Sequence, residues 1–385
     1  MPGEPAALTP RDLVLRFLAS IGRPSEAEQY LRLFQSEHPE QFAIVHVAEP
    51  VMDDGVDALV AGLRYLHALG LHPVLVFGVL GPRTARRNAE RMAAALVPEV
   101  PALVVTPDRV AATVRAGVVA LCPLLEDADG DRDEAGRFDA LAELASRLAT
   151  TKLIFVGRRS GLQPSGGRVV SMVDVSTSDA SALAPALPAA QRRLLAQVER
   201  LFARIPHRFT VSVTSALDLM RELFTVKGAG TLLRKGSVVT RVGGWAEVDR
   251  ARVRALVEEA FGKPLVAGFE DRPVSGIYLA DDYRGAAVMT PTALGPYLSK
   301  FAVTTIARGE GIGRDLWRAL IADHPRLFWR SRADNPITPW YREQCDGMHR
   351  VSLAGAEWWV LWRGLPPADL AGAITYCLAA PPDFA

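Results

Sequence analysis

One stretch of sequence decides the fold: Lys300-Phe-Ala-Val-Thr-Thr-Ile-Ala-Arg308-Gly-Glu-Gly311-Ile-Gly313-Arg314. Its apolar start predicts a strand, its glycines predict a tight turn, and its end predicts a helix. Glycines let backbone N–H groups approach a phosphate, and the helix N-terminus adds partial positive charge to that of Arg308 and Arg314. The stretch therefore predicts a pyrophosphate-binding loop. It is neither a Rossmann fingerprint, because Arg308 stands at the first glycine position, nor a P-loop, because Gly-Lys-Ser/Thr is absent.

The charge distribution around this loop also favours an anionic ligand. The whole chain carries 44 basic and 43 acidic residues, so no global charge points to nucleic acid or an anionic membrane as partner. Between Tyr297 and Arg342, however, eight Lys/Arg face four Asp/Glu. This local excess of positive charge suits a polyanionic cofactor and an acidic substrate.

The overall composition sets the class of protein. With 385 residues, 49% of them hydrophobic and 23% charged, the chain is globular and long enough for two domains. Three cysteines (Cys122, Cys345 and Cys377) show neither metal-ligand spacing nor a disulfide pattern, so we expect no metal and a reducing compartment. We find no signal peptide and no apolar run long enough to span a bilayer. A cytoplasmic protein is the expectation.

Apolar strands and amphipathic helices alternate through the first part of the chain. Strands are expected at 42–47, 73–77, 103–105, 118–122, 152–156 and 208–213. Helices are expected at 11–36, interrupted by Pro24, and at 56–69, 84–96, 137–148, 190–203 and 217–224. Residues 176–190, rich in Ser, Ala and Pro, are expected to form a loop. Strands apolar on both faces indicate a mainly parallel sheet covered by helices, which is an α/β fold.

The second part of the chain reads as a different domain. Glycines at 228, 230 and 236 place a boundary near 237, so the expected domains are 1–237 and 238–385. All seven tryptophans lie beyond this boundary, the first at Trp245. Helices are expected at 249–261 and 311–321, with strands at 276–279, 286–290, 300–304, 327–330 and 357–362.

Several motifs, in order, resemble one family. The loop Arg308-x-x-Gly311-x-Gly313 resembles the pyrophosphate loop of GNAT acetyltransferases, which bind acetyl-coenzyme A. The remaining motifs are Glu222-Leu-Phe-Thr-Val-Lys-Gly-Ala-Gly230, Phe261-Gly-Lys263, Pro296-Tyr-Leu-Ser-Lys300, Leu327-Phe-Trp-Arg330-Ser-Arg332, Asn335-Pro-Ile-Thr-Pro-Trp-Tyr341 and Asp346-Gly347. Together they resemble the N-acetylglutamate synthases in which an amino-acid-kinase domain precedes a GNAT domain. The resemblance is dense over 222–362 and looser over 1–221.

The resemblance implies a direct transfer of acetyl from acetyl-coenzyme A to the amine of L-glutamate, the first step of arginine biosynthesis. Lys263, Lys300, Arg330 and Asn335 would bind glutamate, with Lys300 and Asn335 also catalytic. Tyr341 would protonate the leaving thiolate. The cofactor would be bound by the backbone of Phe301, Ala302 and Val303 and by Arg308, Gly309, Gly311, Gly313 and Arg314. Cationic and amide donors suit a dicarboxylate, and a tyrosine hydroxyl suits a proton donor.

Plainer interpretations stay open beside these roles. Lys300 is equally compatible with an edge lysine, Asn335-Pro336 with a turn, and Tyr341 with core packing. Arg330 and Arg332 alternate along a strand, so Arg330 is assigned to the site and Arg332 to structure. The tryptophans are assigned to core and interface packing. No general base is assigned, and an acyl-enzyme on Cys345 is disfavoured because no histidine partner is placed near it.

The kinase-like half lacks the residues of phosphoryl transfer. An amino-acid kinase needs a lysine at the end of its first strand, where this chain has His46, and Glu49 adds negative charge nearby. After the second strand only Gly78 and Gly81 remain of a glycine cradle. Both changes oppose phosphate binding, so we expect a pseudokinase with an assembly or regulatory role.

The sequence leaves two alternatives to the glutamate N-acetyltransferase function open. One is a non-catalytic regulator that senses coenzyme A or arginine and binds a partner kinase. The other is a bifunctional synthase/kinase, which His46 and Glu49 disfavour. The family also implies a homo-oligomer, with arginine as an allosteric effector.

Overall fold

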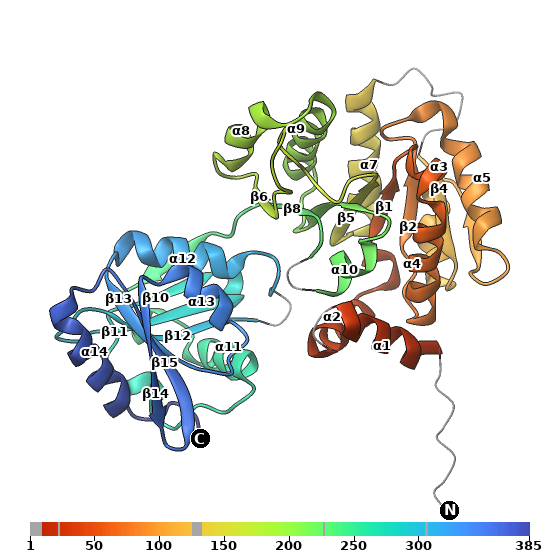
Figure 1. The fold of residues 1–385 in the computed structure, drawn as a ribbon. Coiled ribbons are helices and arrows are strands. Elements are labelled where there is room, and N and C mark those ends of the chain that lie inside the picture. Colours follow the sequence, from red (N-terminus) through yellow and green to blue (C-terminus); the bar gives the residue numbers. More distant parts are fainter. Residues whose placement is uncertain (1–9, 22–23, 125–132, 226–227, 305–306) are drawn as a thin grey trace, which may run out of the picture. The chain divides into compact units, whose positions relative to one another are not determined.

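The computed structural model describes residues 10–21, 24–124, 133–225, 228–304 and 307–385. The chain divides into two compact units, 1–236 and 237–385 (Figure 1). The division falls beside the glycines that were expected to end the first domain. None of the helices in the described ranges is both long and apolar enough to cross a lipid bilayer.

The first unit is built on an eight-stranded sheet with the order β3-β4-β2-β1-β5-β7-β8-β6. Its strands are β1 Ile44–Val47, β2 Val74–Phe77, β3 Ala102–Val104, β4 Val119–Pro123, β5 Lys152–Gly157, β6 Met172–Asp174, β7 Thr210–Ser215 and β8 Thr231–Arg234. Every recorded strand pair is parallel except β7 with β8. The prediction of a mainly parallel sheet is therefore confirmed.

Helices cover both faces of this sheet, as continuous apolar strands require. They are α1 Pro10–Ile21, α2 Pro24–Ser36, α3 Val51–Asp54, α4 Val56–Ala68, α5 Ala85–Leu96, α6 Val110–Arg115, α7 Glu134–Leu148, α8 Asp179–Leu183, α9 Ala189–Arg204 and α10 Leu219–Phe224. Ile44 packs into the core under α6, α7 and α9, whereas its neighbour Val45 packs into the core under α2, α4, α5 and α10. Each such fully buried side chain contributes about 1.5–3 kcal/mol of transfer free energy.

The expected loop at 176–190 is wrong in part, because α8 and a 3₁₀ turn at Ala184–Ala186 lie within it. Ala180 is buried in the core, so a short helix covers part of the sheet. A stretch of small residues lacks the large apolar side chains that make helical periodicity visible in a sequence.

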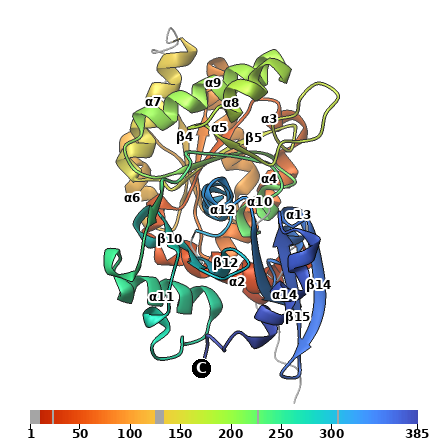
Figure 2. The same ribbon diagram turned by 90° about the vertical axis from the view of Figure 1, so that its left-hand side faces the viewer.

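The second unit is a seven-stranded sheet with the order β14-β15-β13-β12-β11-β10-β9. Its strands are β9 Val239–Val242, β10 Gly276–Ala280, β11 Gly285–Thr290, β12 Tyr297–Val303, β13 Leu327–Arg332, β14 Gly347–Leu353 and β15 Ala356–Arg363. Its helices are α11 Arg250–Phe261, α12 Ile312–Asp323, α13 Thr338–Gln344 and α14 Pro367–Ala379. The hairpin of β14 and β15 forms one edge of the sheet (Figure 2).

Two faces of this second sheet are covered by different helices. Phe301 and Trp329 share a core with α12 and α13, whereas Ala302 shares a core with α11 and Phe328 with α14. All recorded strand pairs are antiparallel except β12 with β13, whose pairing is limited to Tyr297 opposite Phe328. Beyond that point, one edge of β12 has no strand partner among the described residues. This unpaired edge is where the site is built.

Candidate active site

The glycine loop between β12 and α12 has the predicted backbone. Gly309 and Gly311 have φ values of 88° and 82°, a region that favours glycine, and Gly311 caps α12. The amides of Ile312 and Gly313 donate to no described group, so the first turn of α12 offers free N–H donors. Residues 305 and 306 of the quoted stretch lie outside the described residues. The loop fits a pyrophosphate.

The two arginines of this loop are placed differently. Arg308 donates a hydrogen bond of 2.7 Å to the carbonyl of Ala260, and so anchors the loop to the end of α11. Arg314 is exposed on the first turn of α12. A third cation, Arg284, pairs with Glu310 of the loop at 2.6 Å and neutralises its charge. Of the cations around this loop, Arg314 is thus the one whose side chain is exposed to solvent.

Tyr341 lies on α13 within an aromatic cluster. Its ring centroid is 5.4 Å from that of Trp329, 5.6 Å from that of Trp340 and 6.3 Å from that of Phe301. Burial raises the pKa of Tyr341, so the hydroxyl keeps its proton at neutral pH. That hydroxyl has no hydrogen-bond partner in the described part of the chain, which leaves it available to a ligand.

Asn335 builds the turn that leads into α13. Its Nδ2 donates to Ser331 Oγ at 3.0 Å, and its Oδ1 accepts from the amide of Ile337 at 3.2 Å. The turn interpretation of this asparagine is therefore correct, and one amide N–H is still left for a substrate. Ser331 alternates with Arg330 on β13, so Asn335 lies on the same face of the sheet as Tyr341.

Lys300 lies on the opposite face, under α11. Its side chain is only 3% exposed, and its ammonium donates to the Ser299 carbonyl at 3.1 Å and pairs with Asp383. The rings of Phe269 and Phe384 lie 5.1 and 5.3 Å from that ammonium. The ammonium is thus enclosed by protein groups, a setting that no local sequence signal indicated.

Arg330 also lies on this face, against the residues that follow α14. Its guanidinium donates to the carbonyls of Cys377, Ala380 and Pro381 at 2.5, 3.1 and 3.1 Å, and it stacks on Trp358. Since a guanidinium has five N–H donors, two remain for a ligand. Much of this side chain therefore serves to position residues 377–381.

Lys263 follows α11 and is exposed. It lies near Asp334, whose pKa is lowered first by a hydrogen bond from Arg332 and also by the Lys263 charge. The structure thus places Lys263 near the turn that contains Asn335. Arg332, assigned to structure, pairs with Asp334 at 3.1 Å.

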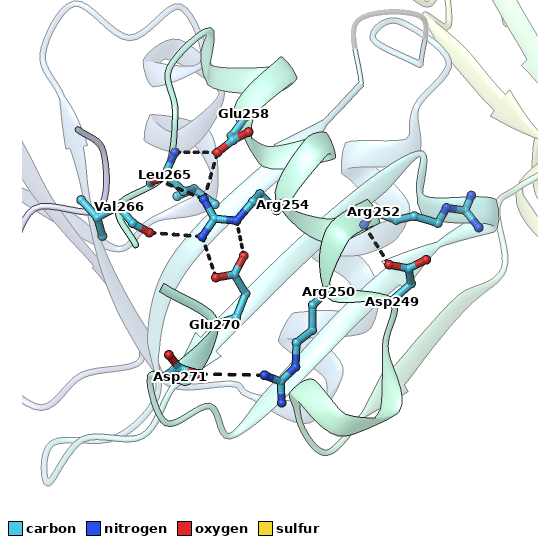
Figure 3. A network of polar contacts seen from close by, with 9 residues as sticks. All are labelled: Asp249, Arg250, Arg252, Arg254, Glu258, Leu265, Val266, Glu270 and Asp271. Carbon is cyan, nitrogen blue, oxygen red and sulfur yellow. Dashed lines mark hydrogen bonds and ion pairs between the residues drawn. The ribbon is translucent and has the colours of Figure 1, made fainter. Parts of the chain in front are cut away.

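A partly exposed arginine that sequence reasoning missed positions the loop after α11 (Figure 3). Arg254 donates to both carboxylate oxygens of Glu270 at 2.5 and 2.6 Å, and to Glu258 at 3.1 Å. It also donates to the carbonyls of Leu265 and Val266 at 3.1 and 3.2 Å. Bidentate charged pairs are strong and directional, so Arg254 fixes the loop that follows Lys263. The Arg254–Glu258 spacing was the available signal, but the partner at Glu270 was not visible from the sequence.

The first unit has its own glycine loop, after β2, and a carboxylate occupies it. Thr84 donates to Glu49 at 3.0 Å, and a Cβ built on Gly81 would lie only 2.9 Å from Glu49 Oε2. His46 is 2% exposed within β1, and burial lowers its pKa to about 3, so it is neutral. Glu49 thus places negative charge against Gly81, and the neutral His46 supplies no positive charge to offset it.

Comparisons with known proteins agree with this geometry. The family model described as N-acetyltransferase of N-acetylglutamate synthase matches residues 240–375. The mitochondrial N-acetylglutamate synthase of Homo sapiens is 30% identical, over 94% of this chain and 77% of that protein. A Xylella fastidiosa (strain 9a5c) protein named acetylglutamate kinase is 28% identical, over 93% of this chain and 98% of its own length.

Among solved structures, N-acetylglutamate synthase from Neisseria gonorrhoeae, complexed with coenzyme A and N-acetyl-glutamate, matches with a TM-score of 0.52 at 18% identity. The match covers 88% of this chain and 98% of that one, and it supports the two-domain fold. The expected fold class, family and N-acetyltransferase activity are therefore confirmed. The chain belongs to the N-acetylglutamate synthase family, as an acetyl-coenzyme A-dependent amino-acid N-acetyltransferase that carries an amino-acid-kinase-like domain before its GNAT domain.

Proposed function

We propose that the second unit acetylates the α-amine of L-glutamate and thereby makes N-acetylglutamate for arginine biosynthesis. The observation that carries this proposal is Tyr341, a buried phenol that keeps its proton and packs beside Phe301. Phe301 lies on the part of β12 that has one unpaired edge. A proton donor is thus held where a thioester bound along that edge would react.

The cofactor is bound by backbone groups and by the loop. The pyrophosphate is bound by the free amides of Ile312 and Gly313 and by the positive charge of Arg314. The backbone of Phe301–Val303 receives the pantetheine arm along the unpaired edge of β12, and one of its N–H groups stabilises the carbonyl oxygen as negative charge develops there. Arg308 acts by anchoring the loop.

The transfer is a direct attack with balanced proton movements. The deprotonated amine of glutamate forms a bond to the thioester carbon, and the carbon–sulfur bond then breaks. Tyr341 donates its proton to the leaving thiolate and regains one from solvent. The amine's own proton passes to water, since neither Asn335 nor the protonated Tyr341 is a base. Asn335 orients the amine, and Lys263 lies near the turn that holds it. Lys300 and Arg330 supply positive charge for the carboxylates from the opposite face of the sheet, where β12 and β13 are not paired with each other beyond one residue pair in the described part of the chain.

An assay of thiol release tests this function. Acetyl-coenzyme A is offered with glutamate, aspartate, glutamine or ornithine, each with and without arginine. We expect thiol release with glutamate in excess of the other amino acids. Folded protein that releases no thiol with any of these amino acids would contradict the proposal.

We further propose that the first unit transfers no phosphate, although some relatives are named acetylglutamate kinase. The Glu49 carboxylate against Gly81 and the neutral, buried His46 support this, because both oppose binding of phosphate oxygens. Incubation with ATP and N-acetylglutamate should give no ADP above background. Formation of acetylglutamyl phosphate would show instead that the enzyme is bifunctional.

Arginine is the effector that we propose for the chain, acting on a homo-oligomer. The supporting observation is that the Neisseria gonorrhoeae synthase was also solved with coenzyme A and L-arginine. Analytical ultracentrifugation with and without arginine tests the assembly.

The three cysteines are free thiols, which suits a reducing compartment, so we assign the enzyme to the cytoplasm.

A further inference from the structure

One carboxylate lies between two cations on the face of the second sheet that holds Lys300. Asp383 pairs with the Lys300 ammonium of β12 and with the guanidinium of Arg272, which follows the 3₁₀ turn Phe269–Asp271. The three side chains differ in exposure, with 3% for Lys300, 15% for Asp383 and 31% for Arg272. The cluster therefore has a buried cation, a shared carboxylate and one cation that reaches solvent.

Backbone contacts hold the segment around Asp383 independently of its carboxylate. The amide of Val266 donates to the Asp383 carbonyl, and the amide of Ala385 donates to the Pro264 carbonyl, both at 3.0 Å. The ring of Phe384 packs against Phe261 with centroids 4.9 Å apart. Arg330 binds the carbonyls of residues 380 and 381 at 3.1 Å. The segment is fixed to the loop after α11 and to β13, so its carboxylate has a defined position.

The charge of Asp383 matters because cations surround it. Lys300 faces Arg272 and Arg330 as well as Asp383, and the Phe269 and Phe384 rings exclude water from its ammonium. Burial lowers the pKa of Lys300 to about 8, and Asp383 acts against that shift. Without the carboxylate, a buried ammonium would face two guanidinium groups, and the neutral form of the lysine would be favoured.

The other titratable groups nearby do not replace this carboxylate. Tyr297, Tyr376 and Cys377 also lie around the cluster, and burial raises the pKa of each. All three are therefore neutral at physiological pH. Asp383 is the anion that Lys300 and Arg272 share in the described part of the chain.

We propose that Asp383 is a positioning residue of the acceptor site, which holds Lys300 charged and beside Arg272 so that the cluster presents net positive charge to an acceptor carboxylate. This rests on the proposed glutamate site, and it adds Arg272 as a contact for the acceptor. In the opposite arrangement, Asp383 occupies the position of an acceptor carboxylate and the acceptor must displace it. Removal of the Asp383 charge would then tighten acceptor binding.

The experiment measures binding of N-acetylglutamate to the full chain by calorimetry, with coenzyme A present, between pH 6 and 9. This probe has two carboxylates and no amine that titrates in that range. We expect Asp383→Asn to weaken binding about tenfold at pH 7.5, the size of a lost charged hydrogen bond. The pH at which affinity falls, near 8 in the unaltered enzyme, should move lower, because the Lys300 pKa drops. The KM for acetyl-coenzyme A should change less than twofold.

Further variants keep the result interpretable. Asp383→Glu retains the charge and should restore most of the affinity. Arg272→Gln leaves the Lys300–Asp383 pair intact but removes a cation that lowers the Lys300 pKa. It should therefore weaken binding and move the pH midpoint higher, opposite to Asp383→Asn, and it tests the cluster if Asp383→Asn does not fold. Asp282→Asn, an exposed carboxylate paired with Arg252, is the matched control.

Three outcomes would overturn the inference. Tighter binding by Asp383→Asn would show that the carboxylate competes with the acceptor. Unchanged affinity with an unchanged pH midpoint would show that Asp383 is structural only. Unaltered enzyme that neither binds N-acetylglutamate nor releases thiol with glutamate would refute the proposed function, and the inference with it.

Discussion

Each unit of this molecule has a strand that leads into a glycine turn and then into a helix, yet the two turns differ in charge. In the first unit Glu49 lies against Gly81, and the nearby His46 is neutral. In the second unit Glu310 is neutralised by Arg284, and Arg314 remains exposed at the start of α12. The comparison teaches that a phosphate site depends on the charge around the glycines as much as on the backbone that they permit.

The largest change in activity is expected at Tyr341, in the acetyltransferase unit. Tyr341→Phe removes the proton donor and keeps the ring packing, so kcat should fall about 100-fold while the KM for glutamate changes little. Steady-state thiol release measures both values. Tyr376→Phe, on α14, is the control and should stay within about twofold. A Tyr341→Phe enzyme with normal kcat would assign the tyrosine to packing.

The next effect concerns His46 in the first unit. Its folded pKa of about 3 lies below the unfolded value of 6.5, so the unfolded state binds more protons between those pH values. Stability should therefore fall as the pH drops below 6.5, by about 2 kcal/mol at pH 5 from this group. Urea unfolding followed by circular dichroism at pH 7 and pH 5 measures the loss. His46→Leu should reduce it, and an equal loss in the variant would assign the acid sensitivity to other groups.

A smaller effect tests the active glycine loop. Gly311→Ala places a side chain at φ 82° and costs about 1 kcal/mol or more of strain, so the loop should shift away from the cofactor. The KM for acetyl-coenzyme A should rise about fivefold to tenfold, with the KM for glutamate nearly unchanged. Gly355→Ala imposes similar strain at φ 75° in the hairpin between β14 and β15. An equal KM increase from both variants would contradict a role of the loop in binding.

The smallest expected effect is at Arg254. Arg254→Gln breaks the bidentate pair with Glu270 and loosens the loop that follows Lys263, so the KM for glutamate should rise about threefold. The exposed Arg252→Gln, on the same helix, provides the comparison. If both variants behave alike, the Arg254 network is not needed to position the acceptor site.

Much of the architecture could be predicted from the sequence, because periodicity and glycine placement act locally. The strands from β1 to β5 and the division of helix 11–36 at Pro24 are confirmed. Strands β6, β8, β9 and β14 and helices α3, α6, α13 and α14 were missed, and α8 was taken for loop. Edge strands such as β9, half exposed and short, lack a continuous apolar run and so give little signal.

The residues of the candidate site could be proposed from the sequence, but their positions relative to one another could not. Alternation along β12 and β13 separates Lys300 and Arg330 from Tyr341 and Asn335 across the sheet. The partner of Lys300 is Asp383, and that of Arg272 is the same carboxylate, far along the chain. Such pairings depend on tertiary packing, so no local pattern indicates them.

The placement of the tryptophans gives this enzyme an internal optical label. All seven lie beyond residue 237, and Trp317, Trp329 and Trp340 pack around Tyr341. Indole fluorescence therefore arises entirely from the acetyltransferase unit, because the kinase-like unit contains no tryptophan. Comparison of emission with circular dichroism during denaturation would resolve whether the two units melt together or one at a time.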